Sequence, residues 1–387
     1  MFKRWNLCIC MFSVVALLVS GCGSSKPAAE SKEIKIGGNL EMTGSIASYG
    51  LSMANGINLA FKEVNAAGGV LGKQLKFIVA DNKSEPSESA NAITKLITQD
   101  KVVLVLGAGA SSNSIAASQV ANEKKVPMLT PFSTNPKVTV ENGKVKEFSF
   151  RGCFIDPFQG TVMAGFATKS LKAKTAAIYT DTSSDYSKGL AQFFEEAFVK
   201  SGGTIVSKDA YLQKDQDFKA TLTKIKSSNP DVIFVPGYYE EVGKLIKQAR
   251  ELGIVAPILG GDGWDSPKLA EIAGATALND SYFSNHYSTD DKSPRVVKFV
   301  EDYKKEYGQA PDAPAVLGYD AAYMAIDAIK RANSADPIKI KDALAQTKNL
   351  QGVTGAITLD AEHNPVKSAV VIEFKDGKPG FKETVNP

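Results

Sequence analysis

The sequence predicts an α/β protein with two lobes, each built on a parallel sheet that helices cover on both faces. Its 387 residues exceed what a single hydrophobic core usually serves. Short aliphatic runs alternate along the chain with helical patterns, and such alternation is typical of parallel sheets. The same alternation starts again after Arg151, which indicates a second lobe of similar construction.

Residues 1–21 are expected to form a signal peptide. Lys3 and Arg4 precede an apolar run that is too short for a stable membrane span. The Val-Ser-Gly-Cys sequence ending at Cys22 looks like a bacterial lipobox, in which the cysteine receives a lipid, and residues 22–32 then read as a flexible tether. An ordinary signal peptide followed by a chance cysteine is the alternative. We expect an exported protein, anchored by lipid to the cell membrane on its periplasmic or extracytoplasmic face.

The cysteines fit this expectation. Cys8 and Cys10 leave with the signal peptide and Cys22 takes the lipid, so Cys153 remains alone and no intramolecular disulfide forms. A buried, inert thiol is the favoured interpretation of Cys153, and a reactive thiol is the alternative.

The elements of the first lobe are expected in the order β-α-β-α-β-α-β. Strands are predicted at residues 33–40, 75–80, 101–106 and 126–129, and helices at residues 53–64, 86–100 and 113–123. The helix at 53–64 has apolar residues at i, i+3, i+4 spacing, which gives it one face to bury against a sheet.

The second lobe is expected to repeat this order. Helices are predicted at residues 157–171, 186–200, 218–228 and 241–252, and strands at residues 175–179, 203–211, 231–235 and 257–259. Further helices at 292–307, 314–332 and 336–347 precede two late strands, near 356–359 and 369–374.

Two loops of the first lobe are rich in hydroxyl groups and free backbone N–H groups. Ser111 follows the third strand, after a turn through Gly107 and Gly109, and Thr134 follows the fourth strand. Ligands of open α/β sheets bind beyond the carboxyl ends of the strands, so these loops are the expected walls of one crevice. They carry no basic residue, which favours a small polar ligand held by neutral donors.

Among the acidic residues, Asp262 is the strongest candidate for binding a ligand. It lies between Gly261 and Gly263 just after a predicted buried strand, where its carboxylate would point into the crevice. A buried charge is costly unless it is paired, so a ligand ammonium would supply the missing partner. Alternatively, Asp262 caps the helix that begins near Ser266 or braces the turn.

Aromatic residues also gather in the loops at predicted strand ends. These residues are Tyr49, Phe132, Tyr186, Tyr238, Tyr239 and Trp264. Their rings could form the wall around an apolar side chain or face an ammonium group. Core packing is the alternative for each ring taken singly.

The sequence lacks the motifs that are typical of several other functional classes. The two histidines, His286 and His363, lie far apart without a cysteine or carboxylate pair at metal-ligand spacing, so no metal site is expected. No P-loop or G-x-S-x-G motif occurs, and Gly107-Ala108-Gly109 is a poor dinucleotide-binding match, so we expect no cofactor and no enzyme activity. A net charge of +3 without a basic stripe argues against nucleic acid.

The chain resembles the leucine/isoleucine/valine-binding proteins of bacterial ABC importers, which have the type I periplasmic binding fold. The resemblance covers nearly everything after the tether. It is carried by Ile34-Lys35-Ile36-Gly37, Thr43-Gly44, Tyr49-Gly50, Asn65-Ala66-Ala67-Gly68-Gly69-Val70-Leu71-Gly72, Ser111-Ser112, Thr130-Pro131, Asp185-Tyr186 and Gly237-Tyr238.

This resemblance implies two Rossmann-like lobes joined by a three-segment hinge, with crossovers near Phe154, Ser284 and Ala369. Lobe I would comprise residues 33–155 and 284–368, and lobe II residues 156–283 and 369–387.

The resemblance also implies roles for the candidate residues. The ligand carboxylate would be bound by Ser111, the main chain of Phe132 and Thr134, and the ammonium by Asp262 with help from the Phe132 carbonyl and Thr134. The pocket lining would include Tyr49, Tyr186 and Tyr238, with Trp264 filling additional volume. Many relatives have glutamate at the position of Asp262 and alanine at that of Phe132, so the family points more firmly to an α-amino acid than to a branched-chain one.

The implied function is that of an extracytoplasmic substrate-binding lipoprotein. It would close over an α-amino acid, with Leu, Ile or Val favoured, and deliver it as a monomer to an ABC permease and its ATPase subunits. The alternatives are a ligand sensor, the same fold specific for an amide or an aromatic acid, and an enzyme.

Overall fold

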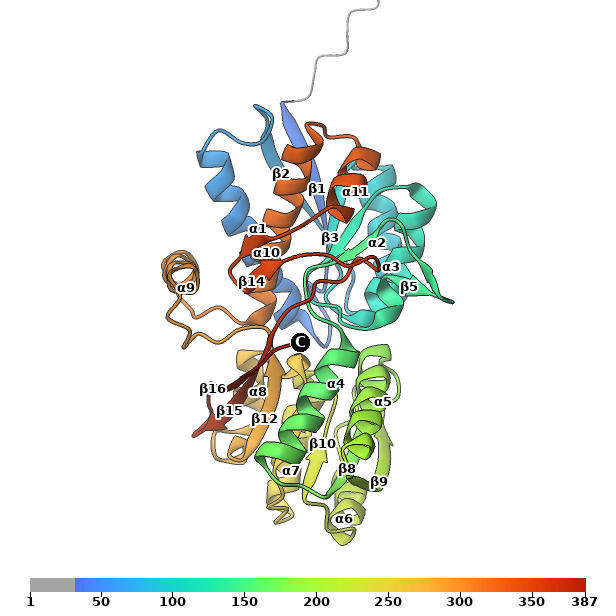
Figure 1. Ribbon diagram of the computed structural model, residues 1–387, viewed down its shortest axis with the longest axis vertical. Helices are drawn as coiled ribbons and strands as arrows, with labels where there is room; N and C mark the ends of the chain where they lie inside the picture. The colour runs from blue at the N-terminus through green and yellow to red at the C-terminus, as the bar shows by residue number, and fades with distance from the viewer. Residues whose placement is uncertain (1–31) are drawn as a thin grey trace, which may run out of the picture. The chain divides into compact units, whose positions relative to one another are not determined.

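The computed structural model describes residues 32–387, which are organised around two main sheets with helices on their faces (Figure 1). The predicted signal peptide, Cys22 and the tether up to residue 31 lie outside the described residues. Within residues 32–387, no helix combines the length and the hydropathy that crossing a membrane requires. We call the body built on the five-stranded sheet lobe I and the body built on the seven-stranded sheet lobe II.

The sheet of lobe I consists of parallel strands in the order β2-β1-β3-β4-β7. The strands are β1 (Glu33–Leu40), β2 (Gln74–Asp81), β3 (Leu104–Gly107), β4 (Met128–Thr130) and β7 (Ser149–Arg151). β3 and β4 are buried along their whole length, as an aliphatic run without alternation predicts. Because parallel strands end at the same edge of a sheet, the loops after β1, β3 and β4 lie together.

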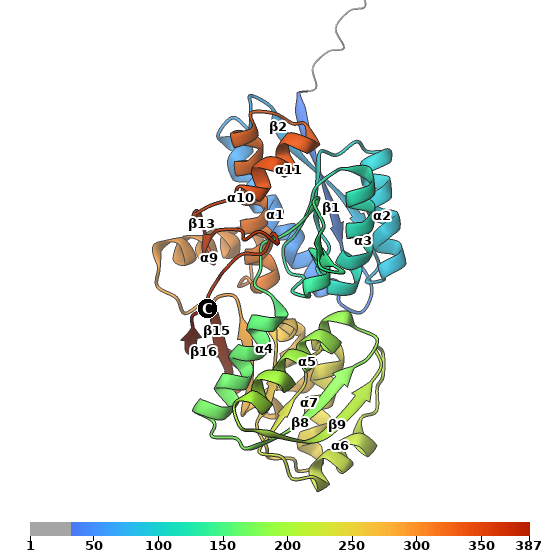
Figure 2. The same ribbon diagram turned by 45° about the vertical axis from the view of Figure 1, so that its right-hand side comes forward.

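Helices sandwich this sheet. They are α1 (Ala47–Ala66), α2 (Pro86–Thr98), α3 (Ser111–Lys124), α9 (Pro294–Tyr307), α10 (Ala313–Ala332) and α11 (Pro337–Ala345). α1 and α10 lie side by side on one face, while α2 and α3 cover the other (Figure 2). α1 and α10 approach closely at Gly56, where a Cβ atom would come within 1.9 Å of the Ala315 carbonyl oxygen. The position of α1 brings its first turn, with Tyr49, to the carboxyl edge of the sheet.

The sheet of lobe II has the strand order β16-β15-β12-β11-β10-β8-β9. Its strands are β8 (Thr175–Asp181), β9 (Thr204–Tyr211), β10 (Val232–Phe234), β11 (Ile258–Gly260), β12 (Ser281–Asn285), β15 (Ala369–Lys375) and β16 (Lys378–Val385). Its helices are α4 (Asp156–Gly165), α5 (Asp185–Lys200), α6 (Lys219–Ser227), α7 (Tyr239–Glu251) and α8 (Pro267–Ala273). The loops after β8, β10 and β11 therefore face the carboxyl edge of lobe I.

The α/β fold with two sheets of parallel strands is confirmed, with one correction. β15 pairs antiparallel with β12, and β16 pairs antiparallel with β15, so lobe II has a mixed sheet. The sequence analysis found β15 but missed β16, which follows through a turn at Asp376 and Gly377. It also missed β12, β7 and the short strands β5 (Val140–Glu141), β6 (Lys144–Val145) and β13 (Leu350–Gly352). The strand predicted near 356–359 overlaps β14 (Gly355–Ile357).

The helix expected at residues 157–171 is divided. α4 ends at Gly165, and a π-helical turn continues over Phe166–Ser170. The helix also begins one residue earlier than expected, so that Asp156 is its first residue. This shift matters, because it puts an acidic side chain at the start of a helix next to the connection between the sheets.

Three segments connect the two sheets: from β7 to α4, from β12 to α9 and from β14 to β15. Each carries a buried ionisable side chain, namely Cys153, His286 and Lys367. Burial raises the pKa of the Cys153 thiol to about 12, so its expected character as a buried thiol is confirmed. The exact residue bounds of the two lobes stay a prediction.

Candidate functional site

Aromatic rings from both lobes meet between the two sheets. The Tyr49 ring, in the first turn of α1, lies 5.2 Å from the Phe132 ring and 5.8 Å from the Tyr238 ring of lobe II. Tyr238 stacks on Tyr186 at 5.1 Å. All four side chains are buried. The structure thus brings together four of the residues that the sequence analysis placed at separate strand ends.

Hydrogen bonds join the lobes around this aromatic cluster of Tyr49, Phe132, Tyr186 and Tyr238. The Tyr49 hydroxyl donates to the Gly263 carbonyl oxygen. At the start of α3, the Ser112 hydroxyl lies 3.0 Å from an Asp185 carboxylate oxygen and accepts from the Asp185 backbone N–H at 3.0 Å. The two lobes are therefore closed upon each other.

Asp262 follows β11 in a short 3₁₀ turn, η3 (Asp262–Trp264), and is buried. Its carboxylate is hydrogen-bonded within the protein, but to neutral groups, so the expected need for a cationic partner stays a prediction. One carboxylate oxygen accepts from the Tyr186 hydroxyl at 2.9 Å, and the other lies 2.8 Å from Nε2 of His286. The alternative capping role is not observed, because Ser266 caps α8 by accepting from the Lys268 N–H.

His286 is a site residue that the sequence analysis missed. It follows β12 on the second connection between the sheets, and its ring stacks on Phe154 at 3.7 Å. Burial lowers its pKa more than the Asp262 carboxylate raises it. A neutral imidazole with its proton on Nε2 would donate that proton to Asp262. Its position at the carboxyl end of a strand was the available signal, but β12 itself was not predicted.

Lobe I contributes hydroxyl groups and backbone N–H groups. Ser111 is the first residue of α3, and its Oγ accepts from the Asn135 N–H at 3.3 Å. Thr134 is buried, and its Oγ1 has no hydrogen-bond partner within residues 32–387. The N-terminus of α3 adds N–H groups that no carbonyl of the helix can satisfy. This wall is therefore suited to an anion such as a carboxylate.

A buried acid, Glu41, holds the lobe I wall in place. Its carboxylate accepts from the Gly109 N–H at 3.0 Å, the Ala110 N–H at 3.1 Å and Asn113 Nδ2 at 2.9 Å. Burial raises its pKa, and these hydrogen bonds oppose the rise. Glu41 thus fixes the turn that leads to Ser111, although it was not among the sequence-predicted site residues.

Asp156 is a second acid that the sequence analysis missed. It is fully buried, and its backbone N–H donates to the Thr134 carbonyl oxygen at 3.0 Å. Burial raises the pKa of its carboxyl group to about 8. The Asp262 carboxylate raises it further, while the Thr134 hydroxyl and the Arg151 guanidinium lower it. Lobe II therefore brings two buried carboxyl groups to the same region.

Trp264 has the contacts of a packing residue. Its indole N–H donates to the Val235 carbonyl oxygen at 3.1 Å, and the side chain is fully buried. The ring covers Gly260 so closely that a Cβ atom there would lie 2.0 Å from it. These contacts belong to lobe II, and a role of Trp264 in forming the ligand pocket stays a prediction.

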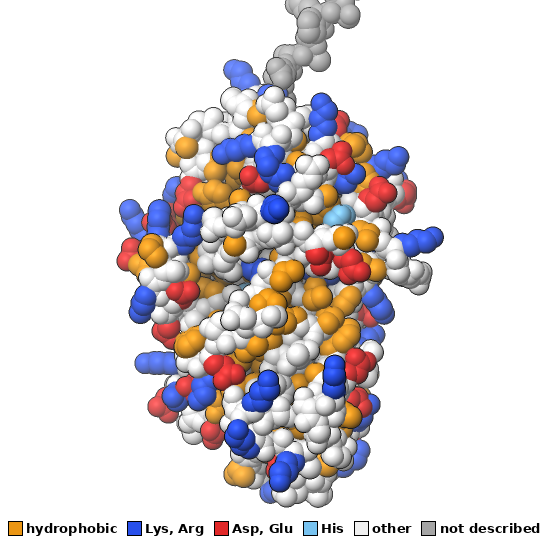
Figure 3. Space-filling model, viewed as in Figure 1, with side chains coloured by type: hydrophobic (Ala, Val, Ile, Leu, Met, Phe, Trp, Pro, Cys, Tyr) orange, Lys and Arg blue, Asp and Glu red, His pale blue; other side chains and the backbone are white. Residues whose placement is uncertain are grey.

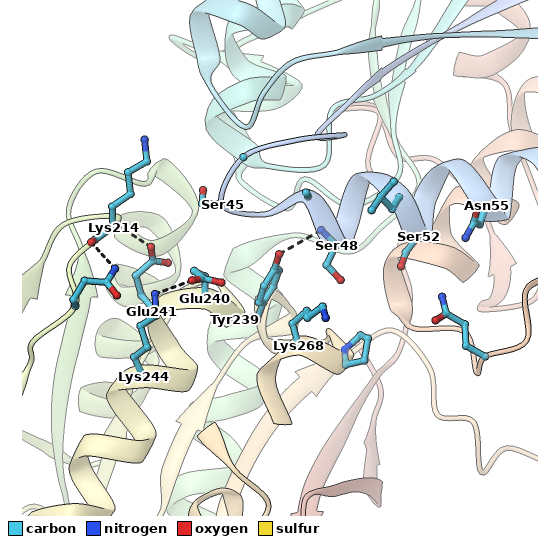
Figure 4. Close-up of a pocket in the computed structure, with 16 residues that line it drawn as sticks. Ser45, Ser48, Ser52, Asn55, Lys214, Tyr239, Glu240, Glu241, Lys244 and Lys268 are labelled. Atoms are coloured by element: carbon cyan, nitrogen blue, oxygen red, sulfur yellow. Dashed lines mark hydrogen bonds and ion pairs between the residues drawn. The ribbon is translucent and has the colours of Figure 1, made fainter. Parts of the chain in front are cut away.

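A groove of about 530 Å³ opens beside the aromatic cluster and is lined by both lobes (Figure 4). Ser48 and Ser52 of α1 lie on one side, and Tyr239 and Lys244 of α7 on the other. The Tyr239 hydroxyl accepts from the Ser48 N–H at 3.3 Å, and its ring lies 5.1 Å from that of Tyr49. One tyrosine ring thus separates the groove from the aromatic cluster.

The charged side chains do not suggest another kind of site. In the part of the chain that the structure describes, no three His, Cys, Asp or Glu side chains are arranged to hold a metal ion. On the face seen in Figure 3, basic and acidic side chains are interspersed. Between the lobes, lobe I contributes hydroxyls and helix N–H groups, lobe II contributes the carboxylates of Asp156 and Asp262, and both lobes contribute aromatic rings.

Comparison with known proteins gives a consistent result. A family model described as periplasmic binding protein matches residues 33–378. An amino acid binding protein of Pseudomonas aeruginosa is 32% identical over 368 residues, which cover 94% of this chain and 96% of that protein.

Two solved structures share the fold at higher identity. A leucine-binding protein, LivK, of Thermotoga maritima is 42% identical with a TM-score of 0.87, covering 92% of this chain and 99% of that chain. The branched-chain amino acid transporter substrate-binding protein LivJ of Streptococcus pneumoniae, solved in complex with isoleucine, is 40% identical with a TM-score of 0.87. That match covers 92% of this chain and 100% of the LivJ chain.

Proposed function

This chain belongs to the periplasmic binding protein family, and on that premise we propose that it captures an α-amino acid between its lobes and delivers it to an ABC importer. Branched-chain amino acids are the favoured ligands. The similarity to the isoleucine-bound LivJ supports this choice over the whole length of the fold. The ABC permease and its ATPase subunits would be the partners of the loaded protein.

The ligand carboxylate would bind to lobe I. Ser111 supplies a hydroxyl at the first turn of α3, and Thr134 supplies a buried hydroxyl whose oxygen has no partner in the described part of the chain. The main chain of Phe132 lies between them in the loop after β4. Hydrogen bonds from such donors to an anion are stronger than those between neutral groups.

The ligand ammonium would bind to lobe II, at Asp262. The Tyr186 hydroxyl and His286 position this carboxylate, and each of its oxygens can accept more than one hydrogen bond. A zwitterion would then bridge a wall of donors and a wall of acceptors, and so favour closure of the two lobes.

The aliphatic side chain of the ligand would contact the rings of Tyr49, Phe132 and Tyr238. Each methylene removed from water there contributes about 0.8 kcal/mol. The large Phe132 side chain narrows this space, which favours a side chain of moderate size.

The protein would work outside the cytoplasm, as other members of its family do. We propose that Cys22 is lipidated and holds the protein at the membrane surface as a monomer. In cells that express the full chain, Cys22→Ala should move the protein from the membrane fraction to the soluble fraction. Retention in the membrane fraction would contradict the anchor.

One observation carries the proposal: buried side chains of the two lobes meet between the sheets, with hydroxyl groups on lobe I and carboxylates on lobe II. Thermal melting with the twenty amino acids, small amides and aromatic acids tests it, because a ligand of the folded state raises Tm. Isoleucine, leucine or valine should give the largest increase. A larger increase with an amide or an aromatic acid would contradict the proposed ligand class.

A further inference from the structure

Two buried oxygen atoms next to Asp262 have no hydrogen-bond partner. They are Oδ2 of Asp156 and Oγ1 of Thr134, and no donor or acceptor in residues 32–387 satisfies them. Both side chains are almost completely buried. An unsatisfied buried polar group is costly, and proteins rarely keep one without a functional reason. The Thr134 hydroxyl lies close enough to Asp156 to oppose the rise that burial causes in its pKa, so the two atoms form one polar group that a ligand can complete.

The surroundings place these atoms on the acidic side of the site. A Cβ atom at Gly189, one helical turn after Tyr186 on α5, would lie 3.5 Å from Oδ2 of Asp156. The charges of Asp156 and Asp262 both raise the pKa of the Tyr186 hydroxyl, whose largest perturbation is burial. Asp156 and Asp262 therefore approach the same tyrosine from different elements, α4 and η3.

The two carboxyl groups differ in how the protein satisfies them. Both oxygens of Asp262 have close partners, Tyr186 and His286. Asp156 has a long contact from Gln159 Nε2 at 3.4 Å to its Oδ1, and the neighbouring Thr134 hydroxyl opposes the rise that burial causes in its pKa. Its second oxygen is thus the acceptor that remains for a cationic group.

The neighbouring cation does not fill this position. Arg151 is buried, but its terminal nitrogens donate to the carbonyl oxygens of Ser133 and Asn135 at 2.7 and 2.8 Å. The other groups acting on Asp156 are neutral or acidic: Thr134, Gln159, Asp262 and, from α5, Tyr186.

We propose that Asp156 is a second acidic contact of the ligand ammonium, and that the ammonium displaces a proton from it. The Asp156 O–H bond breaks, the proton passes to solvent, and the carboxylate accepts an N–H of the ammonium. Thr134 Oγ1 lies beside it as a further acceptor. The inference rests on the proposed function and adds to it a release of protons on capture.

The pKa of about 8 supports this exchange, since burial keeps Asp156 protonated at pH 7 while the ligand is absent. The direction in which ligand affinity changes with pH follows from this exchange. A complex that has lost a proton is favoured as pH rises, so affinity should increase up to about tenfold per pH unit below pH 8 and level off above it. A purely structural role of Asp156 would not produce this slope.

Isothermal titration calorimetry with L-isoleucine tests the inference. Titrations at pH 7 in buffers of different ionisation enthalpy give the number of protons exchanged. The wild-type protein should release up to one proton more than Asp156→Asn, and the variant should bind roughly 10- to 100-fold more weakly, as expected for a lost charge-assisted hydrogen bond. The difference between the two proteins removes the contribution of groups that titrate alike in both.

Ser281→Ala is a matched control. Ser281 Oγ is also buried without a partner among the described residues, but it lies at the first residue of β12, away from the carboxyl edge. This variant should bind isoleucine and release protons like the wild type.

The outcomes separate the two proposals. If the wild type binds isoleucine but exchanges as many protons as Asp156→Asn, the inference is overturned and the proposed function stands. Asp312 of lobe I, whose pKa burial raises to about 7, titrates in the same range with the opposite sign, so the pH slope is measured in an Asp312→Asn background. There, a flat profile from pH 6 to 8 contradicts the inference even if Asp156→Asn fails to fold. No binding of isoleucine or leucine by the wild type contradicts both proposals.

Discussion

Two buried acids on opposite walls of the site, Glu41 and Asp156, are treated very differently by the fold. Glu41 of lobe I accepts N–H groups from Gly109, Ala110 and Asn113, and so has a donor for each of its oxygens. Asp156 of lobe II has a carboxylate oxygen, Oδ2, without a hydrogen-bond partner in residues 32–387. Both are fully shielded from solvent.

This difference distinguishes an acid that supports the fold from one that is available to a ligand. Glu41 stabilises the turn that carries Ser111, because it replaces water for three buried N–H donors. Asp156 keeps an acceptor free at a cost in stability, which is common at functional sites. Burial alone therefore does not identify a binding residue.

The largest expected effect is on stability and comes from the satisfied acid. Glu41→Ala should lower the free energy of unfolding by about 3 kcal/mol, because it leaves the N–H groups of Gly109 and Ala110 buried without an acceptor. Urea unfolding followed by circular dichroism measures this change. Glu41→Gln keeps one acceptor and should lose less. A loss below about 1 kcal/mol for Glu41→Ala would show that Glu41 does not hold the turn.

The next effect is on binding. Asp262→Ala should weaken isoleucine binding by roughly 30- to 100-fold, because the ammonium loses a charged acceptor. It should weaken binding of 3-methylpentanoic acid, the deaminated analogue, much less. Calorimetric titration of both compounds measures the two losses. Equal losses would rule out contact between Asp262 and the ammonium.

Asp312 is a third buried acid, and it differs from Glu41 and Asp156 because, besides burial, the charge of another carboxylate, Asp265, raises its pKa. Asp312 caps α10 in lobe I by accepting from the Ala315 N–H at 3.0 Å. Asp265, after η3, accepts from the Ala313 N–H at 2.8 Å across the contact between the lobes. Burial, followed by the charge of Asp265, raises the pKa of Asp312 to about 7.

The sign of the pH effect is opposite to that at Asp156. If opening of the lobes exposes Asp312, closure takes up a proton between about pH 4 and pH 7, and repulsion opposes closure above pH 7. Asp312→Asn retains a capping oxygen, so it should bind isoleucine at least roughly tenfold more tightly than the wild type at pH 8, and this difference should shrink as the pH falls toward 5. Equal affinities at pH 8 would show that Asp312 does not oppose closure.

Local patterns in the sequence were sufficient for most of the fold. The strand predicted at residues 33–40 matches β1, and the helix predicted at 186–200 matches α5 to within one residue. These elements have local signals: alternating Ile34 and Ile36 in the strand, and an apolar face in the helix. β12 and β16 were missed because their pairing in the sheet, rather than their short sequences, defines them.

The site was predictable to the extent that topology determines it. Tyr49, Phe132, Tyr186 and Tyr238 were expected together because strand ends meet at one edge of a sheet, and their rings are in contact. The pairing of Asp262 with His286 spans 24 residues, and that of Glu41 with Gly109 spans 68. No local pattern encodes such hydrogen bonds, because they depend on how the folded segments are placed.

The central claim, that the two walls together select a zwitterion, is tested most directly by comparing L-isoleucine with compounds that lack one of its charges. 3-Methylpentanoic acid retains the carboxylate, and 2-methylbutylamine retains the ammonium. Calorimetric titration of the wild-type protein at pH 7 should show isoleucine binding at least roughly 30-fold more tightly than either compound, since each loses a charge-assisted interaction. Binding of either compound as tightly as isoleucine would contradict the claim.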